Sequence, residues 1–241
     1  MFDHVTIRVS DRGASRRFYE TLLGQPTHAG DWFDEWDDFS LSQAEAEHAV
    51  TRHLHVGFAA RSREEVDAFW RRGVDAGYAS DGEPGLRPQY HPSYYGGFLL
   101  DPDGNSVESC TGFRDSPGGP PIDHLWLGVR DPLASRRFWE TVAPVLSLQT
   151  REGREGRFHI WSGDRSFAIV DDGRPPAEHV HLAFPVATDV AVAEFHRAAT
   201  AAGYADNGGP GERPEYHAGY VGAFVLDPDG NNVEAVHHNR R

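Results

Sequence analysis

Two sets of side chains in this sequence have the composition of a metal site. A histidine opens an alternating apolar segment at four places in the chain, and a glutamate follows the second and the fourth at the same spacing of 53 residues (108 − 55 and 234 − 181). Two neutral imidazoles and one carboxylate can hold one face of a divalent first-row ion and leave other positions open for substrate or dioxygen. The ligand candidates are His4, His55, Glu108, His124, His181 and Glu234.

Repetition favours ligation over a structural role for these histidines. A single histidine at the start of a strand is more often a satisfied structural group, but four at equivalent places with two matched glutamates favour ligands. His53 and His179 compete, because each lies two residues before a candidate and shares its face. We favour His55 and His181, which stand in the same register as the histidines of the other two segments.

A second cluster contains tyrosine and histidine. Arg-Pro-x-Tyr-His occurs at 87–91 and at 213–217, and one more tyrosine follows each copy. These side chains could form a pocket wall that exchanges protons with a bound substrate, or they could pack a rigid loop. The substrate-pocket candidates are Tyr90, His91, Tyr94, Tyr216, His217 and Tyr220. The sequence assigns no catalytic residue.

The chain contains an internal repeat. Residues 85–110 and 211–236 are identical at 16 of 26 positions with an offset of 126, and earlier segments match with an offset of 120. Self-similarity of this extent predicts two structurally equivalent halves. The segment 114–121, Arg-Asp-Ser-Pro-Gly-Gly-Pro-Pro, combines turn formers without an apolar period and is the predicted linker.

Each half divides again into two modules. An alternating segment predicts a strand, a segment with apolar residues at helical spacing follows, and further strands end at an Asp-Pro-Asp-Gly turn and a last strand. A lone module leaves a sheet face and an edge uncovered, so we expect modules to pair with their helices outside. The predicted domains are 1–113, with modules 1–52 and 53–113, and 122–241, with modules 122–177 and 178–241.

The pairing of modules stays open at this level. If modules pair within a half, one site contains His4, His55 and Glu108. If they exchange between halves, it contains His4, His181 and Glu234. Both arrangements give two sites.

Composition restricts the class of partner. The 241 residues carry 23 basic and 37 acidic side chains, for a net charge of −14, which disfavours nucleic acid and anionic membranes. No long apolar run or secretion signal is present, and the single cysteine, Cys110, fits a reducing compartment. We expect a cytoplasmic monomer or homodimer that binds a small molecule.

The histidine-led strands, the four-module plan and the ending Tyr-His…Asp-Pro-Asp-Gly-Asn…Val-Glu resemble the vicinal oxygen chelate superfamily. This group includes glyoxalase I, bleomycin-resistance proteins and extradiol dioxygenases. The resemblance implies an α+β fold of four βαβββ modules that form two curved, cup-like mixed sheets with helices outside. It also implies a divalent ion, Fe, Mn, Ni or Zn, that chelates two oxygens of a small substrate.

One departure affects the expected reaction. Glyoxalase I has a fourth ligand, usually glutamate, on the last strand of the odd module. The matching segments here offer Ser40, Ser42 or Ala168, and only Asp38 nearby is acidic. Two histidines and one glutamate look more like the extradiol dioxygenases. We therefore expect a dioxygenase first and a glyoxalase-type lyase or isomerase second. The alternative is a drug-sequestering protein in which Trp32, Trp36 and Tyr95 stack on the ligand.

Overall fold

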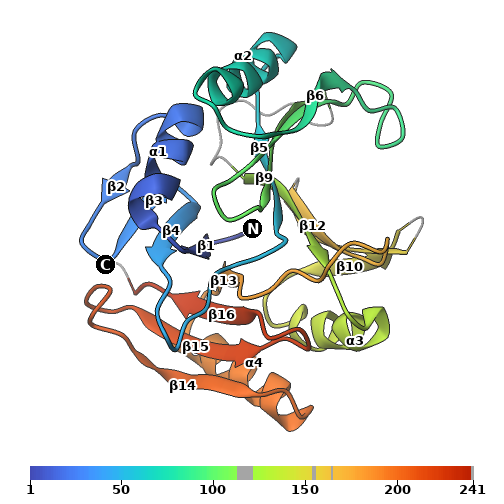
Figure 1. Ribbon diagram of the computed structural model, residues 1–241. Helices are drawn as coiled ribbons and strands as arrows, with labels where there is room; N and C mark the ends of the chain where they lie inside the picture. Colours follow the sequence, from blue (N-terminus) through green and yellow to red (C-terminus); the bar gives the residue numbers. More distant parts are fainter. Residues whose placement is uncertain (113–121, 154–155, 164, 240–241) are drawn as a thin grey trace. The chain divides into compact units, whose positions relative to one another are not determined.

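The structure is a computed structural model that describes residues 1–112, 122–153, 156–163 and 165–239. Within these ranges the strands belong to two open mixed sheets of eight strands each, accompanied by four helices (Figure 1). The expected fold class, α+β with mixed sheets and helices outside, is confirmed. The predicted linker 114–121 lies outside the described residues.

The chain divides into two compact units, which we describe separately. The N-terminal unit is Thr6–Trp126, and the C-terminal unit joins Met1–Val5 to Leu127–Arg241. Strands β1 (His4–Val9) and β9 (Ile122–Gly128) cross the boundary between these units. The first residues of the chain therefore belong to the same unit as its second half.

In the N-terminal unit, strands β6, β7, β8, β5 and β9 are neighbours in that order, and β4, β3 and β2 form a second group (Figure 1). Strands β5 and β8 are parallel, whereas β7 runs antiparallel to β8. The remaining elements of this unit are α1 (Arg12–Leu23), β2 (His28–Ala29), β3 (Phe33–Trp36), β4 (Phe39–Gln43), β5 (His55–Ala59), α2 (Arg63–Asp75), β6 (Ser80–Leu86), β7 (Tyr95–Leu100) and β8 (Ser106–Thr111).

The C-terminal unit repeats this plan. Strands β14, β15, β16, β13 and β1 are neighbours, with β13 and β16 parallel, and β10, β11 and β12 form a second group. The remaining elements are α3 (Pro132–Val142), β10 (Gln149–Glu152), β11 (Arg157–Ser162), β12 (Arg165–Val170), β13 (His181–Pro185), α4 (Asp189–Ala201), β14 (Asp206–Glu212), β15 (Val221–Leu226) and β16 (Asn232–His237).

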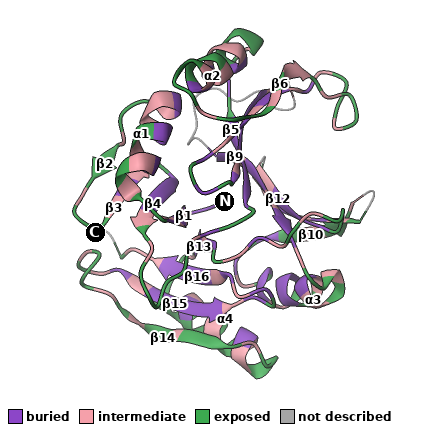
Figure 2. Ribbon diagram, viewed as in Figure 1, coloured by how far each residue is buried: buried purple, intermediate pink, exposed green. Residues whose placement is uncertain are grey.

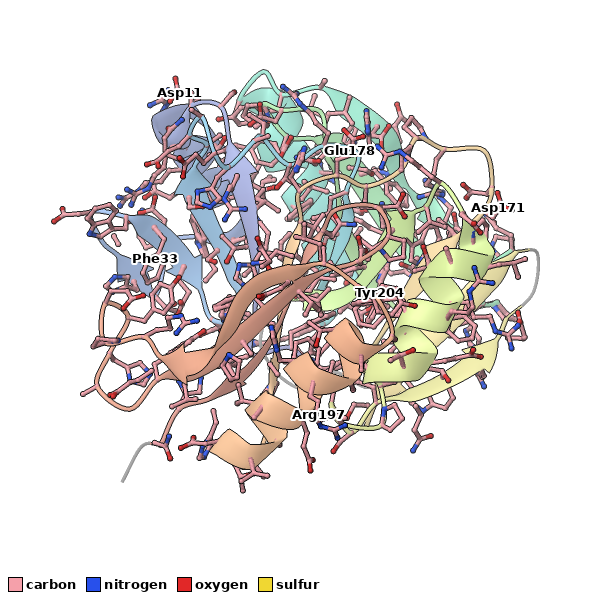
Figure 3. All side chains as sticks on the ribbon, turned by 90° about the horizontal axis from the view of Figure 1, so that it is seen from below. Asp11, Phe33, Asp171, Glu178, Arg197 and Tyr204 are labelled. Atoms are coloured by element: carbon pink, nitrogen blue, oxygen red, sulfur yellow. The ribbon has the colours of Figure 1, made fainter. Side chains whose placement is uncertain are left out.

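Each helix begins at a side chain that accepts a backbone hydrogen bond. The Asp11 carboxylate, labelled in Figure 3, accepts from the Ala14 amide, and Asp131 caps α3 in the same way. Ser62 and Thr188 cap α2 and α4. Such caps satisfy amides that have no partner within the helix. The longest described helices have 13 residues, and none is long and apolar enough to cross a lipid bilayer.

Aromatic side chains form much of the core of each unit. In the C-terminal unit, Trp139 of α3 meets Phe167 of β12 edge to face, with ring centroids 4.7 Å apart. Phe138 meets Tyr204, which is labelled in Figure 3, at 4.9 Å. Edge-to-face contacts of this kind add to the stabilisation from burial alone. Buried faces of the helices thus hold each sheet from one side (Figure 2).

The edge strands β6 and β14 were not predicted. Their sequences, SDGEPGL and DNGGPGE, consist largely of turn formers, and both pair with a neighbour through register shifts. An edge strand tolerates glycine and proline because one side of its backbone needs no partner strand. Figure 2 shows β14 mostly exposed beside the buried β15.

The Asp-Pro-Asp-Gly-Asn turn fixes the register of the strands that carry the candidate ligands. Asp101 accepts hydrogen bonds from the amides of Asp103 and Asn105, at 2.9 and 2.8 Å. The side-chain oxygen Oδ1 of Asn105 accepts from the backbone amide of Leu54, next to the start of β5. The copy at 227–231 makes the same contacts, with Asn231 accepting from the Val180 amide.

Candidate metal centres

The first group of candidate ligands, the His124 centre, consists of His55, Glu108 and His124 in the N-terminal unit. His55 lies at the start of β5, Glu108 on the adjacent β8, and His124 on β9. The Nε2 atom of His55 lies 3.1 Å from Glu108 Oε2 and 3.3 Å from His124 Nε2, and His124 Nε2 lies 3.4 Å from Glu108 Oε2. All three residues are buried.

The second group, the His4 centre, consists of His4, His181 and Glu234 in the C-terminal unit. His181 Nε2 lies 2.9 Å from Glu234 Oε2, and His4 Nε2 lies 3.8 Å from the same oxygen. The side chains of His4 and His181 are 21% and 12% exposed, against 8% and 7% for His124 and His55. The His4 centre is therefore the more accessible of the two.

The structure thus distinguishes the two pairings that the sequence left open. His4 lies with His181 and Glu234, whereas His55 and Glu108 lie with His124. The first strand of each half contributes its histidine to the last module of the other half. The two predicted histidine–glutamate pairs at a spacing of 53 residues are in contact.

The spacing of the ligand atoms fits one ion in each group. Ligand atoms about 2.1 Å from a common ion stand about 3.0 Å apart at right angles and about 3.4 Å apart at tetrahedral angles. The 3.1–3.4 Å separations in the His124 centre fall in this range. In the His4 centre a small movement of His4 would shorten the 3.8 Å separation to the same range. The donor set, two imidazoles and a carboxylate, suits Fe, Mn, Ni or Zn.

A tyrosine and a glycine orient each glutamate. Tyr94 donates to Glu108 Oε1 at 2.9 Å, and Tyr220 donates to Glu234 Oε1 at 2.7 Å, so Oε2 of each glutamate is the oxygen that faces the imidazoles. A Cβ at Gly96 would come within 2.2 Å of Glu108 Oε1. The equivalent glycine, Gly222, leaves the same space beside the second glutamate.

The ring of His124 is held by a β-bulge and a glycine. Strand β9 has one extra residue, Asp123, between the partners of Gly57 and Phe58. A bulge redirects side chains, and here Asp123 Oδ2 lies 2.9 Å from His124 Nδ1. A Cβ at Gly57 would come within 2.3 Å of the His124 ring, so the site requires glycine at that position. Cys110, a packed thiol, lies on the same side with Sγ 4.0 Å from His124 Nδ1.

These contacts set the charges in the His124 centre. Burial would raise the pKa of Glu108, but the hydrogen bonds and charges of His124 and His55 outweigh burial and lower that pKa to about 2. Burial would lower the pKa of His124, but its bonds to Asp123, Cys110 and Glu108 outweigh burial and raise that pKa well above 6.5. Burial raises the pKa of Cys110 to about 12. The ion-free centre is thus an imidazolium–carboxylate pair.

The predicted pocket residues divide into two kinds. Tyr94 and Tyr220 are buried and bonded to the glutamates. Tyr90 meets both Tyr94 and Trp126 edge to face, at 5.4 and 5.0 Å. The other three make different contacts. His91 is exposed and bonds to Ser93. Tyr216 is 57% exposed and its ring contacts the ring of Tyr220. His217 bonds to His238.

Several neighbours of the centres were missed from the sequence. The indole of Trp126 lies 5.0 Å from the His55 ring, and Asp3 Oδ1 lies 2.9 Å from His4 Nδ1. Alternation along His-Leu-Trp already places Trp126 on the face of His124, and an Asp-His pair precedes both halves. The alternation thus predicts a position for Trp126 beside the centre, and the Asp-His pairs predict the same for Asp3 and Asp123.

Other acidic and histidine residues of the sequence analysis lie outside both groups. His53 and His179 are exposed and have left-handed backbone, with φ of 58° each. The buried Asp38 accepts a hydrogen bond from the Ile122 amide. Asp38 thus anchors the start of β9 and is not among the described groups of possible ligands.

Comparison with known proteins agrees with this architecture. Residues 1–109 match the model of the Glyoxalase/Bleomycin resistance protein/Dioxygenase superfamily. The resemblance noted from the sequence is confirmed by this match, which covers 109 of the 241 residues. The comparison with curated proteins found no match.

Two solved structures have a similar fold over nearly the whole chain. Glyoxalase I from Zea mays has a TM-score of 0.71 and 17% identity, over 98% of this chain and 92% of the other. A putative dioxygenase from Bacillus subtilis has a TM-score of 0.65 and 13% identity, over 99% and 85%. At these identities the similarity concerns the fold.

Proposed function

We propose that this chain is a divalent-metal-dependent enzyme with one ion at the His124 centre and one at the His4 centre. These residues would hold the ions, and the open positions of each ion would accept two oxygens of a small substrate. The observation that carries this proposal is the presence of two groups, each with two imidazoles and one buried carboxylate whose ligand atoms lie within 4.8 Å of one another. A buried carboxylate needs such partners because burial of an isolated charge is costly.

A bound ion would supply Lewis acidity and open coordination positions. The chain supplies the orientation. Tyr94 and Tyr220 hold one oxygen of each glutamate, which presents the other oxygen to the ion. Asp3 and Asp123 accept from Nδ1 of His4 and His124, which leaves Nε2 of each ring as the metal-binding atom.

The preferred reaction class is dioxygenation of a small oxygen-rich substrate. Two histidines and one carboxylate with open positions are typical of oxygen-activating iron sites. The side chain that could have completed a four-ligand glyoxalase set, Asp38, is bonded to the Ile122 amide instead. A glyoxalase-type lyase or isomerase is the second candidate, supported by the fold shared with glyoxalase I from Zea mays.

A metal-free sequestering protein is the third candidate, and its proposed stacking residues do not support it. Trp36 is buried and donates to the Gly24 carbonyl, whereas Trp32 is 82% exposed. Tyr95 donates to Asp67. The contacts of Trp36 and Tyr95 thus give these two side chains other roles.

Metal stoichiometry tests the proposal first. The protein is stripped with chelator, reconstituted anaerobically with Fe(II), Mn(II), Ni(II) or Zn(II), and assayed for bound metal. We expect two equivalents in the native chain and one in Glu108→Gln or Glu234→Gln. Glu194→Gln, on the exposed face of α4, is the matched control. Retention of two equivalents in both ligand variants would contradict the proposal.

Turnover then distinguishes the reaction classes. Oxygen uptake with a panel of catechols tests dioxygenation, and formation of lactoylglutathione tests the glyoxalase reaction. Small-molecule binding that persists in strong chelator, without turnover in either assay, would instead support sequestration.

A further inference from the structure

A chain of hydrogen bonds leads away from the His4 centre. Asp3 uses both carboxylate oxygens: Oδ1 lies 2.9 Å from His4 Nδ1, and Oδ2 lies 2.6 Å from His238 Nε2. The other nitrogen of His238, Nδ1, lies 2.8 Å from His217 Nε2. Residues 235 positions apart in the sequence, Asp3 and His238, therefore form one polar array beside a candidate ligand.

The array also contacts the tyrosine that orients the glutamate of this centre. The phenol ring of Tyr220, whose hydroxyl donates to Glu234, meets His217 and His238 edge to face, each at 5.3 Å. The two imidazoles stack at an interplanar angle of 14°. His238 thus contacts the groups that orient both His4 and Glu234.

The acceptors of this array determine which atoms donate. His217 Nδ1 donates to the Ala218 carbonyl, at 2.9 Å. His238 Nε2 donates to the Asp3 carboxylate, and one further hydrogen bond joins the two rings. Hydrogen bonds to a carboxylate are stronger than those between neutral groups.

An ionised Asp3 determines which nitrogen of His4 carries the proton. A carboxylate only accepts, so His4 Nδ1 must be the donor and Nε2 keeps its lone pair for the ion. The bond from His238 to Oδ2 holds the Asp3 carboxylate in the position from which Oδ1 accepts from His4.

In the described part of the chain, the His124 centre has a different neighbour at the place of this histidine pair. Asp123 takes the place of Asp3 beside His124, but the position equivalent to His238 is Gly112 (238 − 126). There the neighbouring strand instead places Cys110 Sγ 3.7 Å from Asp123 Oδ2. A thiol is a weaker hydrogen-bond donor than the imidazole N–H of His238. The two centres therefore differ in how their carboxylate–histidine pairs are held.

We propose that His238 is a positioning residue of the His4 centre. With His217 behind it, His238 holds Asp3 so that Asp3 fixes the Nδ1–H tautomer of His4, and this raises the metal affinity of the His4 centre alone. The part of this inference that concerns affinity rests on the proposed function, whereas the part that concerns the tautomer does not.

Metal affinity is measured in a Glu108→Gln background, in which the His4 centre is the tight site. Co(II) is titrated in competition with a chromophoric chelator. We expect His238→Ala to weaken Co(II) binding at least about tenfold, the lower end of the range for groups that orient metal-bound histidines. His238→Gln, whose amide can still donate to Asp3, should restore most of the affinity. His237→Ala is the control, because His237 bonds to Asp189 instead.

The ion-free protein provides an independent readout. Long-range ¹H–¹⁵N spectra report the tautomer of each histidine. We expect His4 to be in the Nδ1–H form in the native chain and in His237→Ala, and to become a mixture of tautomers in His238→Ala. A His4 tautomer that does not change in His238→Ala would overturn the inference, and so would unchanged Co(II) affinity in a background that binds. Failure of the Glu108→Gln background to bind Co(II) would refute the proposed function, and the spectra would still decide the role of His238.

Discussion

At the scale of single residues, small side chains decide where the ligands can stand. Gly57, Gly96 and Gly222 leave space that an imidazole or a carboxylate fills. The two centres are not identical in this respect, because the position equivalent to Gly57 (57 + 126) is Ala183, which is fully buried beside the His4 centre. The same repeat position therefore has different steric requirements in the two units.

Gly57→Ala tests this requirement. The new methyl group would come within 2.3 Å of the His124 ring, so the ring must move from its present place. We expect metal affinity at the His124 centre to fall at least about tenfold, as for other losses of ligand orientation. Affinity at the His4 centre should not change, and Ala183→Gly is the matched control. Equal affinities for the native chain and Gly57→Ala would show that the ring position is unimportant.

The charge of His124 predicts a pH dependence of metal binding. Its raised pKa means that the ion-free centre holds a proton on His124 at neutral pH, whereas Glu108, with a pKa of about 2, is already ionised. An ion must displace the His124 proton, so affinity should rise about tenfold per pH unit until the raised pKa is passed. Calorimetry in buffers of different ionisation enthalpy measures the release. A Glu234→Gln chain that releases no proton at pH 7 would contradict this charge assignment.

The sequence revealed the six ligand candidates because their types and spacing repeat. It did not reveal His238 or the bulge at Asp123, because both depend on the strand that lies next to the ligand in space. The spacing of His4, His181 and Glu234 along the chain does not indicate which residue contacts the histidine nitrogen that faces away from the ion. The alternation of the strand alone would have predicted that Trp126 lies on the face of His124.

At the scale of elements, the Asp-Pro-Asp-Gly-Asn turn fixes the strand register that brings candidate ligands together. The parallel pairing of β5 and β8 places Gly57 opposite Glu108 and brings His55 within reach of that carboxylate. Asn105 fixes this pairing from one end, because its side chain bonds both to the Leu54 amide and to Asp101. The spacing of 53 residues between histidine and glutamate is a consequence of this register.

Asn105→Ala tests the role of the turn. The substitution leaves the buried amide of Leu54 without its acceptor. We expect the free energy of unfolding to fall by about 1–3 kcal/mol, the cost of an unsatisfied buried group. Chemical denaturation of the ion-free protein measures this change. The control is Asn239→Ala, whose exposed amide bonds to Asp189. A similar, small effect for both substitutions would show that the turn does not fix the register of β5 and β8.

The predicted helices and inner strands occur close to the expected residues, because apolar periodicity and caps act locally. Strands β6 and β14 escaped prediction because nothing local in SDGEPGL or DNGGPGE favours a strand. They form because β7 and β15 offer open backbone edges with which to pair. The neighbouring strands, and not the local sequence, therefore determine that these two segments form strands.

At the scale of the whole molecule, the exchange of first strands between halves could not be predicted. Both pairings bury the same apolar faces and satisfy the same pattern, so the repeat favours neither. The described coordinates place Met1–Val5 with the second half, and every ligand of a centre comes from a single unit. The two centres are therefore complete separately.

This separation predicts independent binding. In Glu234→Gln the affinity of the His124 centre should stay within about twofold of its native value, since independent sites usually behave additively. In Glu108→Gln the same should hold for the His4 centre. Competition titrations with Co(II) give both values. A large change at the remaining centre would demonstrate coupling that the ligand contacts do not explain.

The exchanged strand also imposes an order on assembly during synthesis. The ligands of the His124 centre have all been made once residue 124 has left the ribosome, and the first and the last are 69 positions apart. His4 is made 230 positions before its partner Glu234 (234 − 4). Because chains fold as they emerge, the strand that carries His4 must wait for the module that carries Glu234. Each nascent chain thus completes the His124 centre before the His4 centre.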